Sequence, residues 1–124
     1  MIKLKRINTS HEYYPFVEEL MQTAFPIQER RNADLQREYT DNKLHFHTFV
    51  ILNGNLPIGL LTMWKLESFH YIEHFAIHEK FRNKGYGQKV IELITNEIKG
   101  MIVLEAEEPS DDITNRRIKF YQRQ

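Results

Sequence analysis

The stretch from Phe81 to Gln88, FRNKGYGQ, combines two closely spaced glycines with basic residues. It lies between an extended apolar run, YIEHFAI, and an amphipathic segment, KVIELITNEI. A helix N-terminus exposes unpaired amides and about half a positive charge, which together attract phosphate. Gly85 and Gly87 let the backbone turn tightly and approach a ligand without an intervening Cβ. The surrounding basic residues are Lys80, Arg82, Lys84 and Lys89. The stretch therefore predicts an anion-binding loop, although a glycine pair between strand and helix also occurs as turn chemistry alone.

Two common nucleotide motifs do not match this loop. A P-loop requires Gly-Lys-Ser/Thr at its end, and the dinucleotide fingerprint requires three glycines within a parallel βαβ unit. Here the loop follows a series of hairpin-linked strands, so neither motif is predicted.

The histidines raise the question of a metal site. His45 and His47 would share one strand face, and His70, His74 and His78 recur every four residues. A zinc site also requires a compact further ligand and supporting partners around it. We therefore predict no metal.

Periodicity predicts the elements that position the loop. Alternating residues predict a strand over 2–7, and apolar residues at helical spacing predict a helix from Pro15 to Phe25 and a weaker one over 29–42. Three strands are predicted over 45–52, 56–66 and 69–77, and an Asn-Gly turn joins the first two. A helix that ends at Gly100 and a buried strand over 101–104 follow. The last predicted element is a helix that contains residues 119–121 and is capped by Asp111 or Asp112. The order is β-α-α-β-β-β-α-β-α.

This order predicts one α/β (α+β) domain over residues 1–124. We expect a mixed, mostly antiparallel sheet with helices on both faces.

Arg82-x-x-Gly85-x-Gly87, placed between Phe75-Ala76-Ile77 and the following helix, closely resembles the acyl-coenzyme A signature of the GNAT superfamily of N-acetyltransferases. The resemblance extends from Met1 to Tyr121 and implies transfer of an acetyl group from acetyl-CoA to a primary amine of a small molecule or peptide. It implies that the loop amides hold the cofactor's pyrophosphate and that the preceding strand pairs with pantetheine. The implied cofactor residues are Phe75, Ala76, Ile77, Arg82, Asn83, Lys84, Gly85, Tyr86, Gly87 and Gln88.

Acetyl transfer to an amine requires a deprotonated nitrogen, a polarised carbonyl and a protonated leaving thiolate. Glu73 lies on the strand before the loop, where family members carry a catalytic or substrate-orienting glutamate. Period-two alternation predicts that Glu73 shares a face with Phe75 and Ile77, with His74 on the opposite face. Glu105 follows the next strand, beside the split where family members admit the acceptor. Either glutamate can be the base, or each can be an ordinary exposed or ion-paired side chain.

Tyr121 lies in the Phe-Tyr pair that the family places in its last helix. In the family this hydroxyl is the general acid for the thiolate, and the ordinary tyrosine pKa of about 10 suits proton donation at neutral pH. An aromatic side chain here also packs a helix onto a sheet.

The family pattern normally continues with Gly-Phe and two more strands, whereas this chain ends FYQRQ. We therefore expect an exposed edge on the fifth strand and dimerisation or aggregation. The departure leaves one alternative from another class, a non-catalytic acyl-CoA-binding or regulatory module. A second alternative is an interaction protein that keeps the fold without the ligand.

Composition narrows the remaining classes. Seventeen basic residues balance 17 acidic ones at pI ≈ 7.0, which argues against a nucleic-acid binder. Without cysteine, disulfides and thiolate chemistry are excluded. Since no apolar run approaches the roughly 20 residues of a membrane span, we predict a cytoplasmic protein. Acidic residues follow the 101–104 strand and would favour a cationic acceptor; they are Glu105, Glu107, Glu108, Asp111 and Asp112.

Overall fold

The computed structural model describes residues 1–107 and 116–122, and beyond residue 104 it describes the backbone alone. Within these residues the strands form one six-stranded sheet in the order β1-β2-β3-β4-β5-β6. The strands are β1 (Ile2–Arg6), β2 (Phe46–Asn53), β3 (Leu56–Lys65), β4 (Phe69–Ile77), β5 (Met101–Glu107) and β6 (Arg116–Gln122). Only β4 and β5 pair in parallel among these neighbours. The predicted α/β class with a mixed, mostly antiparallel sheet is confirmed.

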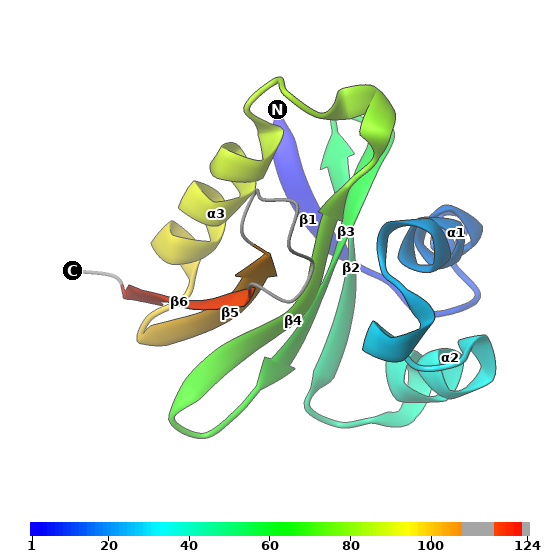
Figure 1. Ribbon diagram of the computed structural model, residues 1–124, viewed down its shortest axis with the longest axis horizontal. Helices are drawn as coiled ribbons and strands as arrows, with labels where there is room; N and C mark the ends of the chain where they lie inside the picture. Colours follow the sequence, from blue (N-terminus) through cyan, green and yellow to red (C-terminus); the bar gives the residue numbers. More distant parts are fainter. Residues whose placement is uncertain (108–115, 123–124) are drawn as a thin grey trace.

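Helices cover both faces of the sheet (Figure 1). They are α1 (Tyr14–Ala24), α2 (Ala33–Asn42) and α3 (Tyr86–Glu97), with 3-10 turns η1 (Ile27–Glu29) and η2 (Glu79–Phe81). Alternation along β2 directs Val50 and Leu52 toward α1 and Ile51 toward α3, which gives each face its own apolar core. Among the described residues, no helix has both the length and the apolar character needed to cross a membrane.

The two helices between β1 and β2 differ in how they are stabilised. Helix α1 has Pro15 in its first turn and buries Val17 and Leu20. Helix α2 begins later than predicted, because Asn32 caps it by accepting a hydrogen bond from the Leu35 amide at 2.8 Å. The buried residues of α2 are polar: they are Gln36 and Thr40, and the Thr40 hydroxyl lies 2.9 Å from that of Thr48.

The last described element is a strand, not the predicted helix. Residues 116–122 form β6, which pairs antiparallel with β5 so that Tyr121 lies opposite Ile102. The edge of β5 that we expected to be exposed is therefore paired. Asp111 and Asp112, the predicted caps, lie outside the described residues. The Phe-Tyr pair resembled a family pattern, but the short alternation of polar and apolar residues from Arg117 to Phe120 also suits a strand.

Gly59 allows β3 to approach β4 closely. A Cβ at this position would lie 2.5 Å from the Ala76 carbonyl oxygen and 3.1 Å from the Ile51 and Ile77 side chains. Backbone atoms cannot move aside as a flexible side chain can, so no side chain fits here without displacing β4.

We therefore expect Gly59→Ala to lower the free energy of unfolding by about 1–3 kcal/mol, the usual cost of overpacking. Urea denaturation measures this change. Gly54→Ala is the control, since a Cβ at Gly54 meets nothing within 4 Å and only its backbone φ of 63° is strained. Equal losses in the two variants would show that the contact with Ala76 has no special weight.

Candidate functional site

The N-terminus of α3 is built to leave its amides available. Gly85 is the N-cap in the left-handed region, with φ 80°, and Asn83 also has a positive φ of 64°. The first bond of the helix runs from the Lys89 amide to the Gly85 carbonyl at 3.2 Å, so the amides before Lys89 have no acceptor within the helix. Unlike α2, α3 has no side-chain cap and no acidic residue in its first turn. This geometry favours an anionic ligand.

Contacts with the sheet fix this loop in place. The Asn53 side-chain Nδ2 donates to the Tyr86 hydroxyl at 3.2 Å, and the Arg82 Nε donates to the Ile77 carbonyl at 2.9 Å. A Cβ at Gly87 would lie 3.9 Å from the Phe75 ring, so the first turn of α3 stands beside β4. The structure thus brings the two predicted cofactor segments, 75–77 and 82–88, together.

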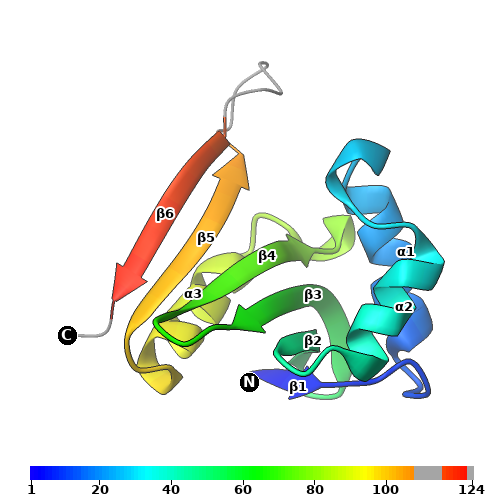
Figure 2. The same cartoon turned by 90° about the horizontal axis from the view of Figure 1, so that it is seen from below.

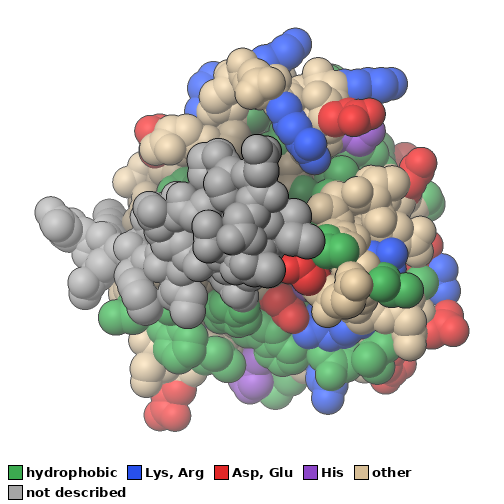
Figure 3. All heavy atoms as spheres, viewed as in Figure 1, with side chains coloured by type: hydrophobic (Ala, Val, Ile, Leu, Met, Phe, Trp, Pro, Cys, Tyr) green, Lys and Arg blue, Asp and Glu red, His purple; other side chains and the backbone are tan. Residues whose placement is uncertain are grey.

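Positive charge surrounds the loop. Figure 3 shows Lys and Arg side chains along the edge of the molecule where Figure 1 draws the connection from β4 to α3. The basic residues of this segment are Lys80, Arg82, Lys84 and Lys89. None of them belongs to an ion pair between described residues. Their charge is therefore available to attract an anion to the exposed amides.

β4 and β5 separate beside this loop. Their parallel pairing runs from Phe69–Met101 to Ile72–Leu104 and stops there, and Figure 2 shows β5 turning away from β4 beyond that point. We call the opening between residues 73–77 and 105–107 the strand split. Glu73 and Glu105 are each the first residue past the last pair, so the register places the two candidate bases at its closed end.

The main chain of β4 presents a free edge to the strand split. The His78 amide donates to the Ile58 carbonyl of β3 at 2.8 Å. Antiparallel pairing alternates, so Ala76 also directs its main-chain groups toward β3, whereas those of Phe75 and Ile77 face away from it. The Ile77 carbonyl is already bound by Arg82. A ligand in the split would therefore pair with Phe75 and with the Ile77 amide.

Glu73 does not share a face with Phe75 and Ile77, contrary to our prediction. Thr62 lies opposite His74 and Met63 lies opposite Ile72, so Glu73 is an extra residue in a β-bulge. Phe75 and Ile77 pack on the α3 side, whereas Glu73 and His74 both contact residues 29–31 on the other face. Period-two alternation fails here because the bulge resets it.

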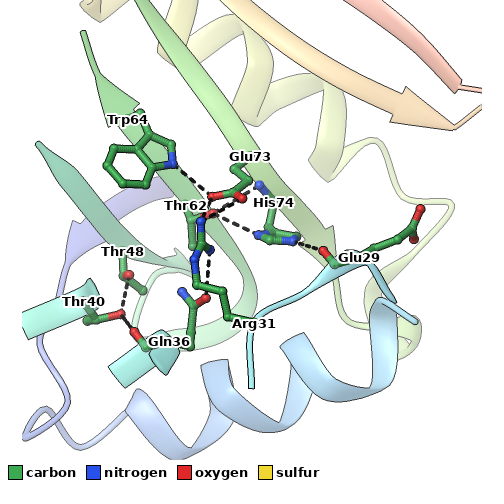
Figure 4. A network of polar contacts seen from close by, with 9 residues as sticks. All are labelled: Glu29, Arg31, Gln36, Thr40, Thr48, Thr62, Trp64, Glu73 and His74. Atoms are coloured by element: carbon green, nitrogen blue, oxygen red, sulfur yellow. Dashed lines mark hydrogen bonds and ion pairs between the residues drawn. The ribbon is translucent and has the colours of Figure 1, made fainter. Parts of the chain in front are cut away.

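The Glu73 carboxylate is held by two donors (Figure 4). Arg31 Nη2 lies 2.7 Å from Oε1 and 2.9 Å from Oε2, and the Trp64 indole nitrogen donates to Oε1 at 3.0 Å. The Arg31 guanidinium carbon lies 4.3 Å from the centre of the Tyr39 ring and 5.3 Å from that of Phe46. Sequence reasoning missed Arg31 and Trp64, because neither belongs to a recognisable motif.

His74 is buried and fixes the same segment. Its Nε2 lies 2.8 Å from the Glu29 carbonyl, and its backbone amide donates to the Thr62 hydroxyl at 3.1 Å. The Phe25 ring meets its imidazole edge-on at 4.7 Å. His74 therefore joins the connection between α1 and α2 to the bulge in β4.

The other predicted residues lie further from this network. Tyr121 is paired with Ile102, three positions before the split opens at Glu105, so the register does not bring it beside Glu73. The side chains of Glu105 and of the acidic cluster that follows it lie outside the described residues. Among described residues, no cluster of three or more His, Asp or Glu could hold a metal ion.

Two other histidines, His47 and His70, have lowered pKa values. Burial lowers the pKa of His47, with a further contribution from the positive charge of Arg6, and burial beside Lys65 lowers the pKa of His70. Both side chains are therefore neutral at pH 7.

Comparison with known proteins identifies the kind of fold that carries this site. The profile of the Acetyltransferase (GNAT) family matches residues 13–124. A solved protein from Bacteroides thetaiotaomicron, assigned to the GNAT family of acetyltransferases, is 40% identical with a TM-score of 0.82. The match covers 89% of this chain and 63% of that protein, so the chain spans less than two thirds of its relative's length.

More distant structures share the fold. An aminoglycoside acetyltransferase from an uncultured soil metagenomic sample, solved with sisomicin, is 20% identical with a TM-score of 0.62, covering 89% of this chain and 80% of that one. AAC(6')-Iy, solved with the bisubstrate analogue CoA-S-monomethyl-acetylneamine, is 14% identical with a TM-score of 0.60, covering 100% and 99%. No curated protein sequence matches this chain.

Proposed function

Since the chain belongs to the acetyltransferase (GNAT) family, we propose that it transfers an acetyl group from acetyl-CoA to a primary amine of a small molecule or peptide. The observation that carries the proposal is the uncapped N-terminus of α3, begun by Gly85 in the left-handed region, beside the free edge of β4. The loop supplies amides and positive charge for a pyrophosphate, and the strand edge supplies backbone partners for an amide-containing arm.

The described residues fit acetyl-CoA. The loop from Arg82 to Gln88 would hold the pyrophosphate, and Phe75 and Ile77, with Ala76 between them, would pair with pantetheine. Bound acetyl-CoA supplies the acetyl group as a thioester. The protein's own contribution is to fix that thioester in the strand split, where Glu73 and Glu105 are the first residues past the last pair of β4 and β5.

The proposed proton transfers involve three residues. Glu73 or Glu105 accepts a proton from the amine nitrogen, directly or through water. The family resemblance assigns the Tyr121 hydroxyl as the acid for the departing thiolate, and this role requires the hydroxyl to reach the split from its register position opposite Ile102. The contacts of Glu73 favour orienting over proton abstraction for that residue, because Arg31 already binds both of its oxygens. Glu105 is then the preferred base.

Titration calorimetry of acetyl-CoA into the protein, followed by turnover assays with sisomicin, spermidine and a lysine peptide, tests the proposal. We expect micromolar-range binding and acetylation of at least one amine. Binding without turnover of any amine would instead support the non-catalytic acyl-CoA module. A folded sample that does not bind acetyl-CoA would refute both.

Glu105→Gln and Tyr121→Phe test the assigned roles in the same assays. Loss of a general base or acid typically lowers kcat about 100-fold or more, with cofactor binding unchanged. Unchanged turnover in both variants would remove these assignments while leaving the family activity intact.

A further inference from the structure

Arg31 makes more contacts than an ordinary surface ion pair. Its Nη2 binds both oxygens of Glu73, its Nη1 donates to the Gln36 side chain at 3.2 Å, and its guanidinium lies against the rings of Tyr39 and Phe46. Its side chain is only 16% exposed. One guanidinium nitrogen thus makes charge-assisted hydrogen bonds to both carboxylate oxygens, while the guanidinium carbon lies over two aromatic rings, and both kinds of contact restrict the movement of Arg31.

Aromatic rings close this arrangement from several sides. The Trp64 ring meets Phe46 edge-on at 4.9 Å and Tyr39 at 5.9 Å, while its indole nitrogen reaches Glu73. The guanidinium, the carboxylate and the indole are therefore held in one cluster (Figure 4). Rotation of Glu73 would break contacts with both Arg31 and Trp64.

Hydrogen-bond capacity remains on one oxygen of Glu73. An ionised carboxylate offers about four lone-pair sites, two on each oxygen. Oε1 accepts from Arg31 and Trp64, whereas Oε2 accepts only from Arg31 among the described residues. The Glu73 side chain is 24% exposed, and a lone-pair site on Oε2 is not used by any donor among the described residues.

Arg31 also belongs to a segment that contacts two consecutive residues of the bulge, Glu73 and His74. Residues 29–31 contact His74 through the Glu29 carbonyl and Glu73 through Arg31. The connection between α1 and α2 is thus fastened to β4 where the strand split begins.

We propose that Arg31 is a positioning residue that holds Glu73 so that Oε2 orients the acceptor amine at the closed end of the strand split. The inference rests on the proposed acetyl transfer. It differs from a model in which a cationic acceptor displaces Arg31, because displacement would break the contacts with Glu73, Gln36 and two rings together. It predicts that Arg31 acts on the acceptor through Glu73 and has no effect on cofactor binding.

The single tryptophan of the chain gives a direct readout of this positioning. We expect the indole N–H resonance of Trp64 in a ¹⁵N spectrum to shift in Arg31→Met and in Glu73→Gln. Arg37→Met is the matched control, since Arg37 pairs with Glu18 and Asp34 away from β4. An unshifted Trp64 resonance in Arg31→Met would overturn the proposal, because Glu73 would then keep its place without Arg31.

A double-variant cycle tests the effect on catalysis. With whichever of sisomicin, spermidine or the lysine peptide is acetylated, we expect Arg31→Met to lower kcat/KM for the amine about tenfold, while the Kd for acetyl-CoA stays within about twofold. The Arg31→Met/Glu73→Gln double variant should be no worse than Glu73→Gln alone. Arg31→Lys should recover part of the loss, and it replaces Arg31→Met in the cycle if the methionine variant does not fold.

Each remaining outcome is decisive. Additive losses, or equal losses in amine kinetics and acetyl-CoA binding, would show that Arg31 only supports the fold and would overturn the proposal. If the wild type binds acetyl-CoA but acetylates none of the three amines, the proposed function fails and the role of Arg31 fails with it. A failure of Arg31 alone leaves wild-type turnover intact, so the two failures are distinguishable.

Discussion

Replacing Gly85 by valine is expected to weaken acetyl-CoA binding about 100-fold or more. Gly85 has φ 80°, a conformation that costs an L-residue about 1–2 kcal/mol and a β-branched residue more. A valine would therefore leave the left-handed region and redirect the amides that begin α3. Hydrogen bonds to a charged group contribute about 1.5–3 kcal/mol each, so losing two of them removes at least about 3 kcal/mol. Each 1.4 kcal/mol is a factor of about ten in Kd, which calorimetry measures.

Gly100→Val is the matched control for this loss. Gly100 also has a positive φ, 96°, and a Cβ there likewise meets nothing within 4 Å. It follows α3 instead of preceding it, so the backbone strain is comparable but the loop amides are untouched. We expect both variants to melt at lower temperature and only Gly85→Val to lose the cofactor. Parallel loss of binding in both would attribute the effect to general destabilisation.

Gly87→Leu is expected to separate stability from binding. The φ of Gly87 lies outside the left-handed region, and its added Cβ would make only an ordinary 3.9 Å contact with Phe75. Leucine favours a helix over glycine, so the variant should melt at or above the wild-type temperature. Its side chain would nevertheless stand beside the exposed amides and keep a pyrophosphate away from them. We expect a loss of affinity of about 100-fold, equivalent to about 2.7 kcal/mol.

Gly87→Ala completes that comparison. A methyl group is the smallest addition, and a Cβ at this position makes only an ordinary 3.9 Å contact with Phe75, so acetyl-CoA affinity should remain close to that of the wild type. The measurements are calorimetry for binding and a thermal melt for stability. If Gly87→Leu bound acetyl-CoA normally, the first turn of α3 would not be the anion site.

Local patterns in the sequence predicted most of the elements around the loop. The Asn-Gly turn predicted the β2–β3 hairpin, and the glycine pair predicted the position at which α3 begins. Both features depend on short-range backbone chemistry, which a few residues specify. The anion-binding character of the loop was inferred from the same local features, and it stays a prediction.

Long-range features were not predictable in this way. The bulge at Glu73 depends on how β4 registers against Thr62 and Met63, and this register changed the face on which Glu73 lies. The contact between Arg31 and Glu73 joins residues 42 positions apart. Residues 116–122 were predicted to form a helix because the Phe-Tyr pair matches a family pattern. The segment forms a strand because it pairs with β5, and this pairing is not visible in the local sequence.

The strand split also bears on how cooperatively this protein unfolds. Within the described residues, four parallel pairs join β5 to β4 and so to the rest of the sheet. The apolar contacts of Ile102 and Leu104 with the core stabilise this pairing. Local separation of the β5–β6 pair from β4 therefore breaks far fewer contacts than global unfolding does. A ligand that contacts both β4 and β5 binds better when the two strands are paired than when they are separated. Its binding therefore stabilises the pairing of β4 with β5. Ligand binding and the separation of β5 from β4 are therefore thermodynamically linked.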